Sequence, residues 1–243
     1  MDSKVEFLFL NEEDMIKAGV LDADRAVDTI GEVITLLSEG DYLMGGRAHN
    51  DHGVQLIFPE KSDIPNFPLA DSADRRFMAM PAYLGGRFHM CGEKWYGSNG
   101  RNSHKGLPRS ILMATLNDVE TGQPLAYMSA NLLSAMRTGA MPGLTAMYLA
   151  RKDSKVLTIL GAGVIGRTSL MAIMAKFPDL EVLKIKGSSK TSHTAHELAD
   201  YARENYKSLK EIIICETLEE AVRDADIIAE AVSVEPRKWP VID

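Results

Sequence analysis

Residues 155–166 read Lys-Val-Leu-Thr-Ile-Leu-Gly-Ala-Gly-Val-Ile-Gly, and this stretch decides the fold. The apolar run at 156–160 is typical of a buried parallel strand. Gly161, Gly163 and Gly166 follow at the spacing G-x-G-x-x-G, and helical apolar periodicity comes next. After such a strand, the first glycine permits a tight turn, the second admits a pyrophosphate to the backbone, and the third lets the helix pack on the sheet. Because the N-terminus of the helix also offers free N–H groups, the stretch predicts dinucleotide binding.

Strands and helices alternate after this motif. Apolar runs at 181–186, 212–215 and 226–232 predict further strands, and 193–206 predicts a helix between the first two of them. Another short helix is expected to begin at Thr217. Alternation at this spacing is typical of a parallel sheet with right-handed crossovers. The second half of the chain therefore predicts a Rossmann domain in an α/β protein.

The end of the strand at 181–186 bears on the choice of cofactor. NAD-binding proteins usually carry an acidic side chain here, which accepts hydrogen bonds from the ribose 2′-hydroxyl. This sequence has Gly187 instead, followed by Ser188, Ser189 and Lys190. Lys190 and the serine hydroxyls would hold a 2′-phosphate, which favours NADP(H) over NAD(H). The alternative is that the lysine is a solvated surface charge and the serines form only a turn.

The first half of the chain has a different pattern. A strand-like run at 5–10 is followed by an amphipathic helix at 23–39. Short apolar runs separated by turn residues then predict an antiparallel-rich α+β domain. The expected strands are 54–58, 77–83, 88–96, 110–117 and 124–128, the last two joined by a hairpin loop at 118–122.

A helix at 131–150 is expected to bridge two domains. Pro142 lies inside it and should kink or restart it, because proline lacks the N–H that a helix interior needs. We therefore expect an α+β domain at 1–130 for substrate binding and dimerisation, and a Rossmann domain at 131–243.

The bulk composition argues against some partners. The chain has 27 Lys and Arg against 34 Asp and Glu, and its formal net charge of −7 argues against nucleic acid or an anionic membrane. No apolar run approaches the ~18 residues that span a bilayer. The N-terminal residues lack the apolar region of a signal peptide. Cys91 and Cys215 lie far apart in sequence and suit a reducing compartment, so we expect a cytoplasmic protein.

Three cations mark a candidate substrate site. Arg47 follows a pair of glycines, Lys94 lies at the end of a predicted strand, and Arg137 lies on an otherwise apolar and small-residue helix. A cation on such a face is rarely left unpaired, and a bound carboxylate or phosphate would pair with it. The alternative for each is a structural salt bridge or a snorkelling surface side chain. The histidines and cysteines complete no metal-ligand spacing, so no metal site is expected.

Several motifs run in order along most of the chain. They are Gly-Glu-Lys-Trp at 92–95, Gly-Leu-Pro at 106–108, Leu-Asn-Asp-Val-Glu-Thr-Gly-Gln-Pro-Leu at 116–125, Arg-Thr-Gly-Ala at 137–140 and Gly-Ala-Gly-Val-Ile at 161–165. In these motifs the chain resembles the ornithine cyclodeaminase/μ-crystallin family. The Arg-Thr-Gly-Ala segment followed by a dinucleotide fingerprint is the more specific part. The resemblance implies redox chemistry at an amino-acid α-carbon.

The resemblance also implies roles for particular residues. Residues that match Arg47, Lys94 and Arg137 hold the substrate carboxylate in the family. The family's catalytic aspartate and last Rossmann strands would lie beyond Asp243, so the Rossmann domain is expected to be C-terminally incomplete, in either a fragment or a shortened natural protein. The residues expected to contact the cofactor are Arg137, Thr138, Gly161, Gly163, Val164, Ile165, Gly166, Ser188, Lys190, Val232 and Ser233.

The activity that the resemblance implies is an NAD(P)-dependent conversion of L-ornithine to L-proline and ammonia. Nicotinamide takes hydride from Cα, the side-chain amine attacks the resulting imine, ammonia leaves, and hydride returns. One alternative is an NADPH-dependent reductase of a cyclic imine (a ketimine) or of an opine-type imine. Another is a non-catalytic protein, because μ-crystallins bind small carboxylated ligands. The expected partners are a small amino or imino acid and a second copy of the chain in a homodimer.

Overall fold

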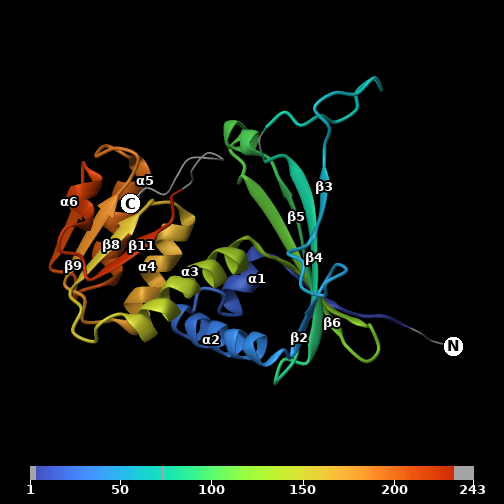
Figure 1. Ribbon diagram of the computed structural model, residues 1–243, viewed down its shortest axis with the longest axis horizontal. Coiled ribbons are helices and arrows are strands. Elements are labelled where there is room, and N and C mark those ends of the chain that lie inside the picture. The colour runs from blue at the N-terminus through green and yellow to red at the C-terminus, as the bar shows by residue number, and fades with distance from the viewer. Residues whose placement is uncertain (1–3, 73, 233–243) are drawn as a thin grey trace. The chain divides into compact units, whose positions relative to one another are not determined.

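The computed structural model describes residues 4–72 and 74–232 and shows an α/β protein that divides into two units (Figure 1). The first unit takes the described residues of Met1–Val20 and Glu32–Ser134, and the second takes those of Leu21–Gly31 and Ala135–Asp243. The division differs from a single boundary near residue 130, because an N-terminal segment packs with the second unit.

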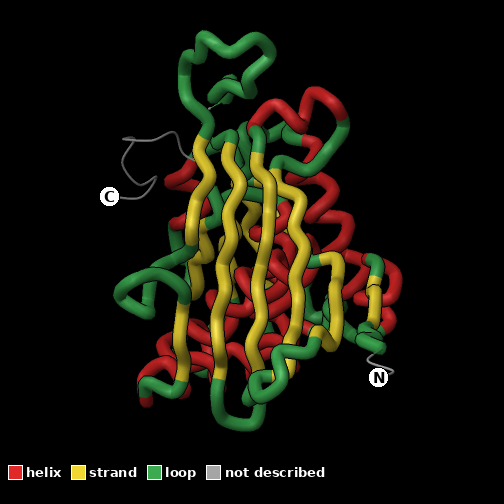
Figure 2. Tube along the Cα trace, turned by 90° about the vertical axis from the view of Figure 1, so that its right-hand side faces the viewer, coloured by secondary structure: helices red, strands yellow, loops and turns green. Residues whose placement is uncertain are grey.

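The first unit is built on a seven-stranded sheet with the order β1-β7-β6-β5-β4-β2, in which β3 also pairs with β4 (Figure 2). All pairs are antiparallel except β1 with β7. The prediction of an antiparallel-rich α+β domain is thus confirmed. Its elements are β1 (Leu8–Leu10), α1 (Glu12–Lys17), β2 (Tyr42–Met44), β3 (Val54–Ile57), β4 (Arg76–Leu84), β5 (Met90–Ser98), the 3₁₀ helix η1 (Gly100–Lys105), β6 (Ser110–Asp118) and β7 (Pro124–Ser129).

The two faces of this sheet differ in burial. On the core face, Met78, Tyr96 and Leu112 are buried together, and α1 packs on the same face near β7. The other face, which we call the open face, carries large apolar side chains that remain exposed. They are Phe9, Leu43, Val54, Leu56, Phe77, Trp95, Ile111 and Leu125, which the strand registers and alternation place on one side.

The second unit contains a four-stranded, all-parallel sheet with the order β10-β9-β8-β11. Helices α4 and α5 pack on the face that carries Leu157 and Ile159. Helix α6 packs on the opposite face, where the Thr158 hydroxyl donates to the Ala221 carbonyl at 2.6 Å. The predicted Rossmann topology is confirmed. Its elements are β8 (Val156–Leu160), α4 (Val164–Lys176), β9 (Val182–Lys186), α5 (His193–Asn205), β10 (Glu211–Ile214), α6 (Leu218–Val222) and β11 (Ile227–Glu230).

Helix α3 (Asn131–Leu149) packs very closely on α4. A Cβ built on Gly139 would lie 2.4 Å from the backbone carbon of Thr168, so only glycine permits this approach. The Thr168 hydroxyl in turn donates to the Ala135 carbonyl at 3.0 Å. The helix is continuous through Pro142, so the predicted restart does not occur.

Helix α2 (Ala23–Glu39) contributes to both units. In its first half, Val27 is fully buried against Ala140 and Ala172 in the second unit. In its second half, Glu32 pairs with Arg87 of the first unit. The amphipathic pattern predicted this helix with its observed bounds.

Candidate functional site

The loop between β8 and α4 leaves backbone donors unused at the start of a helix. Gly161 has a φ of +90°, which side-chain-bearing residues rarely adopt. Gly163 is the N-cap of α4 and has no side chain with which to cap the helix. The Arg167 N–H donates to the Gly163 carbonyl at 3.0 Å. The N–H groups of the three residues before Arg167 have no backbone acceptor within 4–72 and 74–232, as expected for a helix N-terminus.

The surroundings of the three glycines are compatible with a bound dinucleotide. A Cβ on Gly161 would lie 2.5 Å from the Ala231 carbonyl oxygen, and one on Gly166 would lie 2.0 Å from the Gly161 carbonyl oxygen. These two glycines therefore permit the tight turn and the close packing of helix on strand. A Cβ on Gly163 would meet no atom of the described residues within 4 Å, so on their side the space in front of it is open to a pyrophosphate.

The loop lies at the point where the strand order reverses. Strand β8 is flanked by β9 and β11, and ligands of open parallel sheets bind beyond the carboxyl ends of strands at such a switch point. The Ala231 N–H donates to the Leu160 carbonyl at 2.7 Å. The Val232 nitrogen would lie 3.0 Å from a Cβ on Gly161. Of the two expected cofactor residues here, Val232 is thus beside the glycine loop, and Ser233 lies outside the described residues.

Gly187 directly follows β9, in the position where NAD-binding proteins carry an acid. A Cβ there would lie 2.9 Å from the Ser192 Cβ and 3.1 Å from the Ala195 Cβ, so α5 packs too closely for a carboxylate side chain. Ser188 and Lys190 are exposed beside it. Their contact with a ribose or a 2′-phosphate stays a prediction.

Arg137 and Thr138 lie on α3 in the second unit. Thr138 is half-buried, and Arg137 is exposed, while the flanking Met136 and Gly139 are buried. The expected contact of Arg137 with substrate and cofactor rests on the family motif alone.

Arg47 and Lys94 both lie in the first unit. Arg47 is exposed in the loop after β2. Lys94 lies in the middle of β5 rather than at the end of a strand, which corrects its predicted position. It is on the core face, where its Nζ atom lies 5.2 Å from the ring centroid of Tyr96. Arg137 belongs to the other unit, so the joint carboxylate site of the three cations stays a prediction.

A charged group near β4, which the sequence pattern did not single out, surrounds Asp74. Its carboxylate accepts hydrogen bonds from the Ser98 hydroxyl and, at 2.7 Å, from Arg109 Nε, and it pairs with Arg76. Burial by itself raises the pKa of Asp74, but the Ser98 hydrogen bond and the two guanidinium groups lower it below its ordinary value. Strand register joins these residues, which come from distant segments, so no contiguous stretch of sequence marks them as a group.

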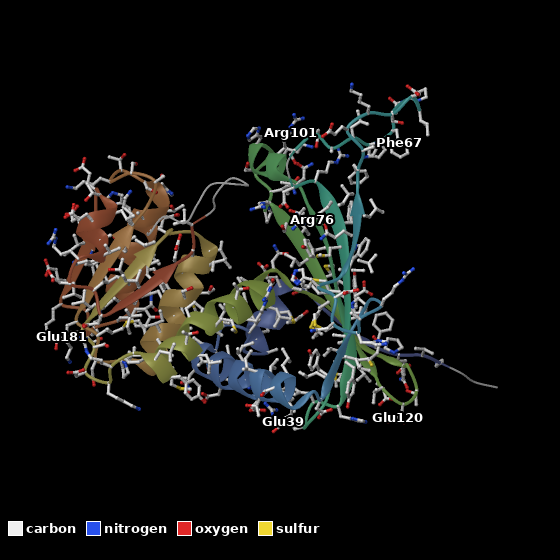
Figure 3. The ribbon with its side chains drawn as sticks, in the orientation of Figure 1. Glu39, Phe67, Arg76, Arg101, Glu120 and Glu181 are labelled. Carbon is white, nitrogen blue, oxygen red and sulfur yellow. The ribbon has the colours of Figure 1, made fainter. Side chains whose placement is uncertain are left out.

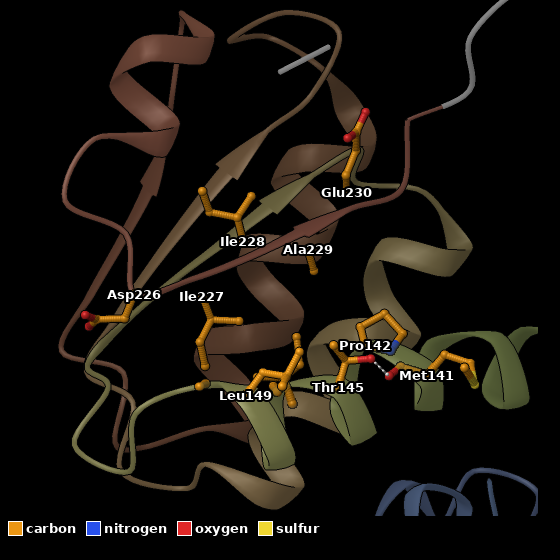
Figure 4. Close-up of a pocket in the computed structure, with 12 residues that line it drawn as sticks. Met141, Pro142, Thr145, Leu149, Asp226, Ile227, Ile228, Ala229 and Glu230 are labelled. Carbon is orange, nitrogen blue, oxygen red and sulfur yellow. Dashed lines mark hydrogen bonds between the residues drawn. The ribbon is translucent and has the colours of Figure 1, made fainter. Parts of the chain in front are cut away.

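A pocket of about 470 Å³ lies in the second unit between α3 and β11 (Figure 4). Pro142, Thr145 and Ile228 contribute to its mostly apolar wall, and the Thr145 hydroxyl donates to the Met141 carbonyl at 2.9 Å. It runs along the flank of β11 and is lined by none of the expected cofactor residues. It is therefore separate from the glycine loop.

The described residues show neither a membrane-spanning helix nor a metal site. No helix there is both long enough and apolar enough to cross a membrane. No group of three or more His, Cys, Asp or Glu residues in this part of the chain is arranged to hold a metal ion.

The family model of the ornithine cyclodeaminase/mu-crystallin family matches residues 22–242. The chain belongs to this family. The resemblance that the motifs indicate is thus confirmed, over nearly the whole chain.

Curated proteins similar to this chain are named as dehydrogenases and as a reductase. N-((2S)-2-amino-2-carboxyethyl)-L-glutamate dehydrogenase of Staphylococcus aureus is 37% identical over 72% of this chain and 48% of that protein. Alanine dehydrogenase of Archaeoglobus fulgidus is 31% identical over 98% of this chain and 63% of its own length. Delta(1)-pyrroline-2-carboxylate reductase of Bacillus cereus is 36% identical over 46% of this chain and 33% of that protein. The chain thus spans less than two thirds of the length of these relatives.

Solved structures give the same picture of the fold. An archaeal alanine dehydrogenase dimer with bound NAD superposes with a TM-score of 0.72 at 29% identity, over 92% of this chain and 60% of that one. The Thermococcus litoralis Delta(1)-pyrroline-2-carboxylate reductase, in complex with NADH and L-proline, gives a TM-score of 0.70 at 26% identity. The match covers 92% of this chain and 61% of that one. A lysine cyclodeaminase gives 0.70 at 23% identity, over 98% and 64%, and shows the fold alone.

Proposed function

We propose that the protein is an NAD(P)-dependent oxidoreductase that exchanges hydride with the α-carbon of an amino acid, with an imine as the oxidised partner. One observation carries the proposal: Gly163 is open at the N-terminus of α4, between two glycines that admit no side chain. This arrangement supports a pyrophosphate against the backbone. The relatives at least 30% identical support the reaction, because their names describe chemistry at an amino-acid carbon–nitrogen bond.

Each group of residues has a distinct role in this proposal. A bound nicotinamide cofactor supplies the hydride chemistry. The glycine loop would hold the pyrophosphate, and Ser188 and Lys190 would hold the adenosine ribose. Arg47, Lys94 and Arg137 would fix the substrate carboxylate, so that the α-carbon is held in one orientation.

We favour one net hydride transfer, as in an amino-acid dehydrogenase or an imine reductase. The relatives at 31–37% identity carry such names, whereas the likeness to a cyclodeaminase is at 23% identity and bears on the fold alone. The ornithine cyclodeaminase reaction, in which the hydride returns to the product, is the second candidate, because the family is named for it.

Cofactor preference and assembly complete the proposal. The lack of space for an acid at Gly187, with Ser188 and Lys190 exposed beside it, supports NADP(H) over NAD(H). The apolar open face of the first unit's sheet supports a homodimer, and the archaeal alanine dehydrogenase is described as a dimer.

The test is to assay the intact protein on three substrate pairs: L-alanine with NAD⁺ or NADP⁺, pyrroline-2-carboxylate with NADPH, and L-ornithine with NAD⁺. Net oxidation or reduction of the nicotinamide, followed by its absorbance, supports the proposal. Formation of L-proline from ornithine without a net change in reduced cofactor supports the cyclodeaminase instead. Binding of cofactor and carboxylated ligand without turnover supports the non-catalytic alternative, and failure to bind either cofactor contradicts all three.

A further inference from the structure

We propose that His196 on α5 is a positioning residue for the cofactor. It fixes the main chain at Lys190, so that the ammonium group of this lysine is held ready for the 2′-phosphate of NADP(H). The inference rests on the proposed function, in which Ser188 and Lys190 hold the adenosine ribose. It adds a residue outside the set expected to contact the cofactor, one that acts on the choice between NADP(H) and NAD(H).

The His196 imidazole holds the loop between β9 and α5 by its main chain. Its Nε2 atom lies 3.1 Å from the Lys190 carbonyl oxygen. Because a carbonyl oxygen only accepts hydrogen bonds, Nε2 carries the proton and donates. His196 lies near the start of α5, and helical side chains lean towards the N-terminus of their helix, so the ring reaches back over the loop. The contact thus joins a helix to the residue that carries the positive charge.

Further contacts within the loop restrain the main chain of the same lysine. The Ser192 N–H donates to the Ser189 carbonyl at 3.1 Å, which closes a turn with Lys190 and Thr191 at its centre. The hydroxyl oxygens of Ser189 and Thr191, on either side of Lys190, lie 3.2 Å apart. The side chain of Lys190 is nevertheless exposed. Because a group that is already ordered loses less freedom when its ligand arrives, these restraints suit a lysine that meets a ligand.

The charge of Lys190 acts at the edge of the sheet where a cofactor would bind. Figure 3 labels Glu181, which comes just before β9, and the loop with Lys190 follows the other end of that strand. On α6, the Glu216 N–H is the first cause of a lowered pKa at Glu220, and the charge of Lys190 contributes to it. Helix α6 follows the carboxyl end of β10, so this charge acts across the carboxyl ends of two neighbouring parallel strands. Ligands of open parallel sheets bind beyond such ends.

His193 offers a matched control. It is exposed, as His196 is, and it lies one turn earlier on the same helix. Its Nδ1 atom lies 3.3 Å from a carboxylate oxygen of Glu197, so this contact stays within α5. Replacing either histidine with alanine removes the same ring from the first turns of α5, but only the change at His196 releases the Lys190 carbonyl.

The experiment titrates the intact protein and its variants with NADPH and with NADH by calorimetry. We expect His196→Ala to weaken NADPH binding by roughly three- to tenfold, the scale of one hydrogen bond, and to leave NADH binding almost unchanged. His196→Gln can still donate to the Lys190 carbonyl, so it should restore most of the affinity. His193→Ala should keep all of it. In a Lys190→Ala protein, His196→Ala should have little further effect, because it acts through the lysine.

The outcomes separate this inference from the proposed function. If His196→Ala keeps the wild-type affinity for NADPH, or weakens NADPH and NADH equally, the positioning role is wrong and the proposed function stands. The same holds if His196→Ala weakens NADPH binding by one factor with and without Lys190, because the histidine then acts on the helix alone. If the wild-type protein binds neither cofactor, the proposed function itself is wrong. Thermal unfolding of each variant shows that a lost affinity does not reflect a lost fold.

Discussion

The surroundings that favour glycine differ between Gly163 and the two other glycines of the loop, Gly161 and Gly166. The backbone of Gly163 is extended, with φ −82° and ψ −166°, which any residue can adopt. Within 4–72 and 74–232, no atom lies within 4 Å of the position of its missing Cβ. Gly161 and Gly166, by contrast, would bring a Cβ against backbone atoms. The missing side chain at position 163 therefore leaves space that a bound ligand would occupy, at a helix N-cap where glycine is also favoured.

We expect Gly163→Val to fold with at most a modest loss of helix capping, and to lose at least tenfold in dinucleotide affinity, ~1.4 kcal/mol. The branched side chain would occupy the space that the pyrophosphate needs. Calorimetric titration with NADPH and NADH, beside thermal unfolding, checks both parts. Gly166→Ala is the contrasting variant. Its main expected effect is a loss of thermal stability rather than of dinucleotide affinity. A folded Gly163→Val protein with normal dinucleotide affinity would show that the dinucleotide does not bind at this loop.

Asp226 shows a structural role for a charged residue at the opposite end of the same sheet. Its carboxylate accepts hydrogen bonds from the N–H groups of Lys155 at 2.7 Å and Val156 at 2.9 Å, and it pairs with Arg151. These backbone donors, and then Arg151, lower the pKa of Asp226 below its ordinary value. Asp226 thus ties the start of β11 to the start of β8.

We predict that Asp226→Ala costs about 1–3 kcal/mol at neutral pH, because two backbone donors lose their acceptor. A carboxylate with a lowered folded pKa stabilises the protein above its unfolded pKa, about 4, and that contribution is lost as the pH falls through the folded pKa. The stability difference between wild type and variant should therefore shrink in acid. Urea unfolding at several pH values measures it. Asp153→Ala is the control, since this 87% exposed side chain also lies near Arg151 and should matter little.

At the scale of elements, the sequence predicts the helices and strands that a long, contiguous residue pattern marks. The apolar run at 156–160 and the amphipathic stretch at 23–39 match β8 and α2 as observed. The start of β5 was predicted two residues early, because Gly86 and His89 take positive φ in the preceding turn. The conformation of such a turn depends on how the two strands pair, and the residue pattern of one strand does not specify that pairing.

The same contrast between local patterns and strand pairing applies to the candidate site. The glycine loop is contiguous in sequence, so its residues and their spacing identify it directly. The group around Asp74 draws on β4, β5 and the start of β6, and its register depends on pairings between distant segments. Composition and periodicity do not specify that register, so Arg76 and Arg109 could not be selected beforehand.

The loop from β9 to α5 carries the prediction on cofactor choice. We expect the protein to bind NADPH more tightly than NADH, and Lys190→Ala to weaken NADPH binding while NADH binding stays the same, because only NADPH brings a 2′-phosphate to this lysine. Calorimetric titrations with both cofactors measure this. Lys207→Ala, at another exposed lysine of the same unit, is the control. A tenfold preference of the wild-type protein for NADH, ~1.4 kcal/mol, would contradict the prediction.

At the scale of the whole molecule, the open face of the first unit's sheet predicts self-association. Phe77 and Trp95 stack there with ring centroids 5.5 Å apart, and Ile111 is 47% exposed beside them. Exposed apolar patches of this kind mark protein interfaces.

We predict that the wild-type protein is a dimer and that Ile111→Lys is monomeric at the same concentration, because the lysine would put a charge into the buried interface. Light scattering after size-exclusion chromatography gives the mass directly. Ile64→Lys is the control, since Ile64 is also exposed but lies in a loop outside the sheet. A wild-type protein that stays monomeric at every concentration would contradict the assignment of this face.

The predicted carboxylate site combines cations from distant parts of the sequence, so its test also belongs to this scale. Lys94→Ala should weaken amino-acid binding by roughly 1.5–3 kcal/mol, the scale of a hydrogen bond to a charged group, with little effect on the cofactor. Arg137→Lys should weaken both ligands, because lysine cannot copy the two-bond grip of a guanidinium. Separate titrations of substrate and cofactor distinguish the two. Lys17→Ala, on an exposed position of α1, is the control, and full substrate affinity in Lys94→Ala would favour a purely structural role.

The division of α2 between the two units bears on how these proteins can be recombined. A gene cut near residue 130 would separate Val27 from Ala140 and Ala172, and would leave a methyl-lined void in the nucleotide-binding half. A chimaera between relatives that exchanges only the C-terminal part would therefore join mismatched cores. An exchange that carries residues 21–31 together with 135–232 keeps the native neighbours of Val27, so the transferable module is discontinuous in the gene.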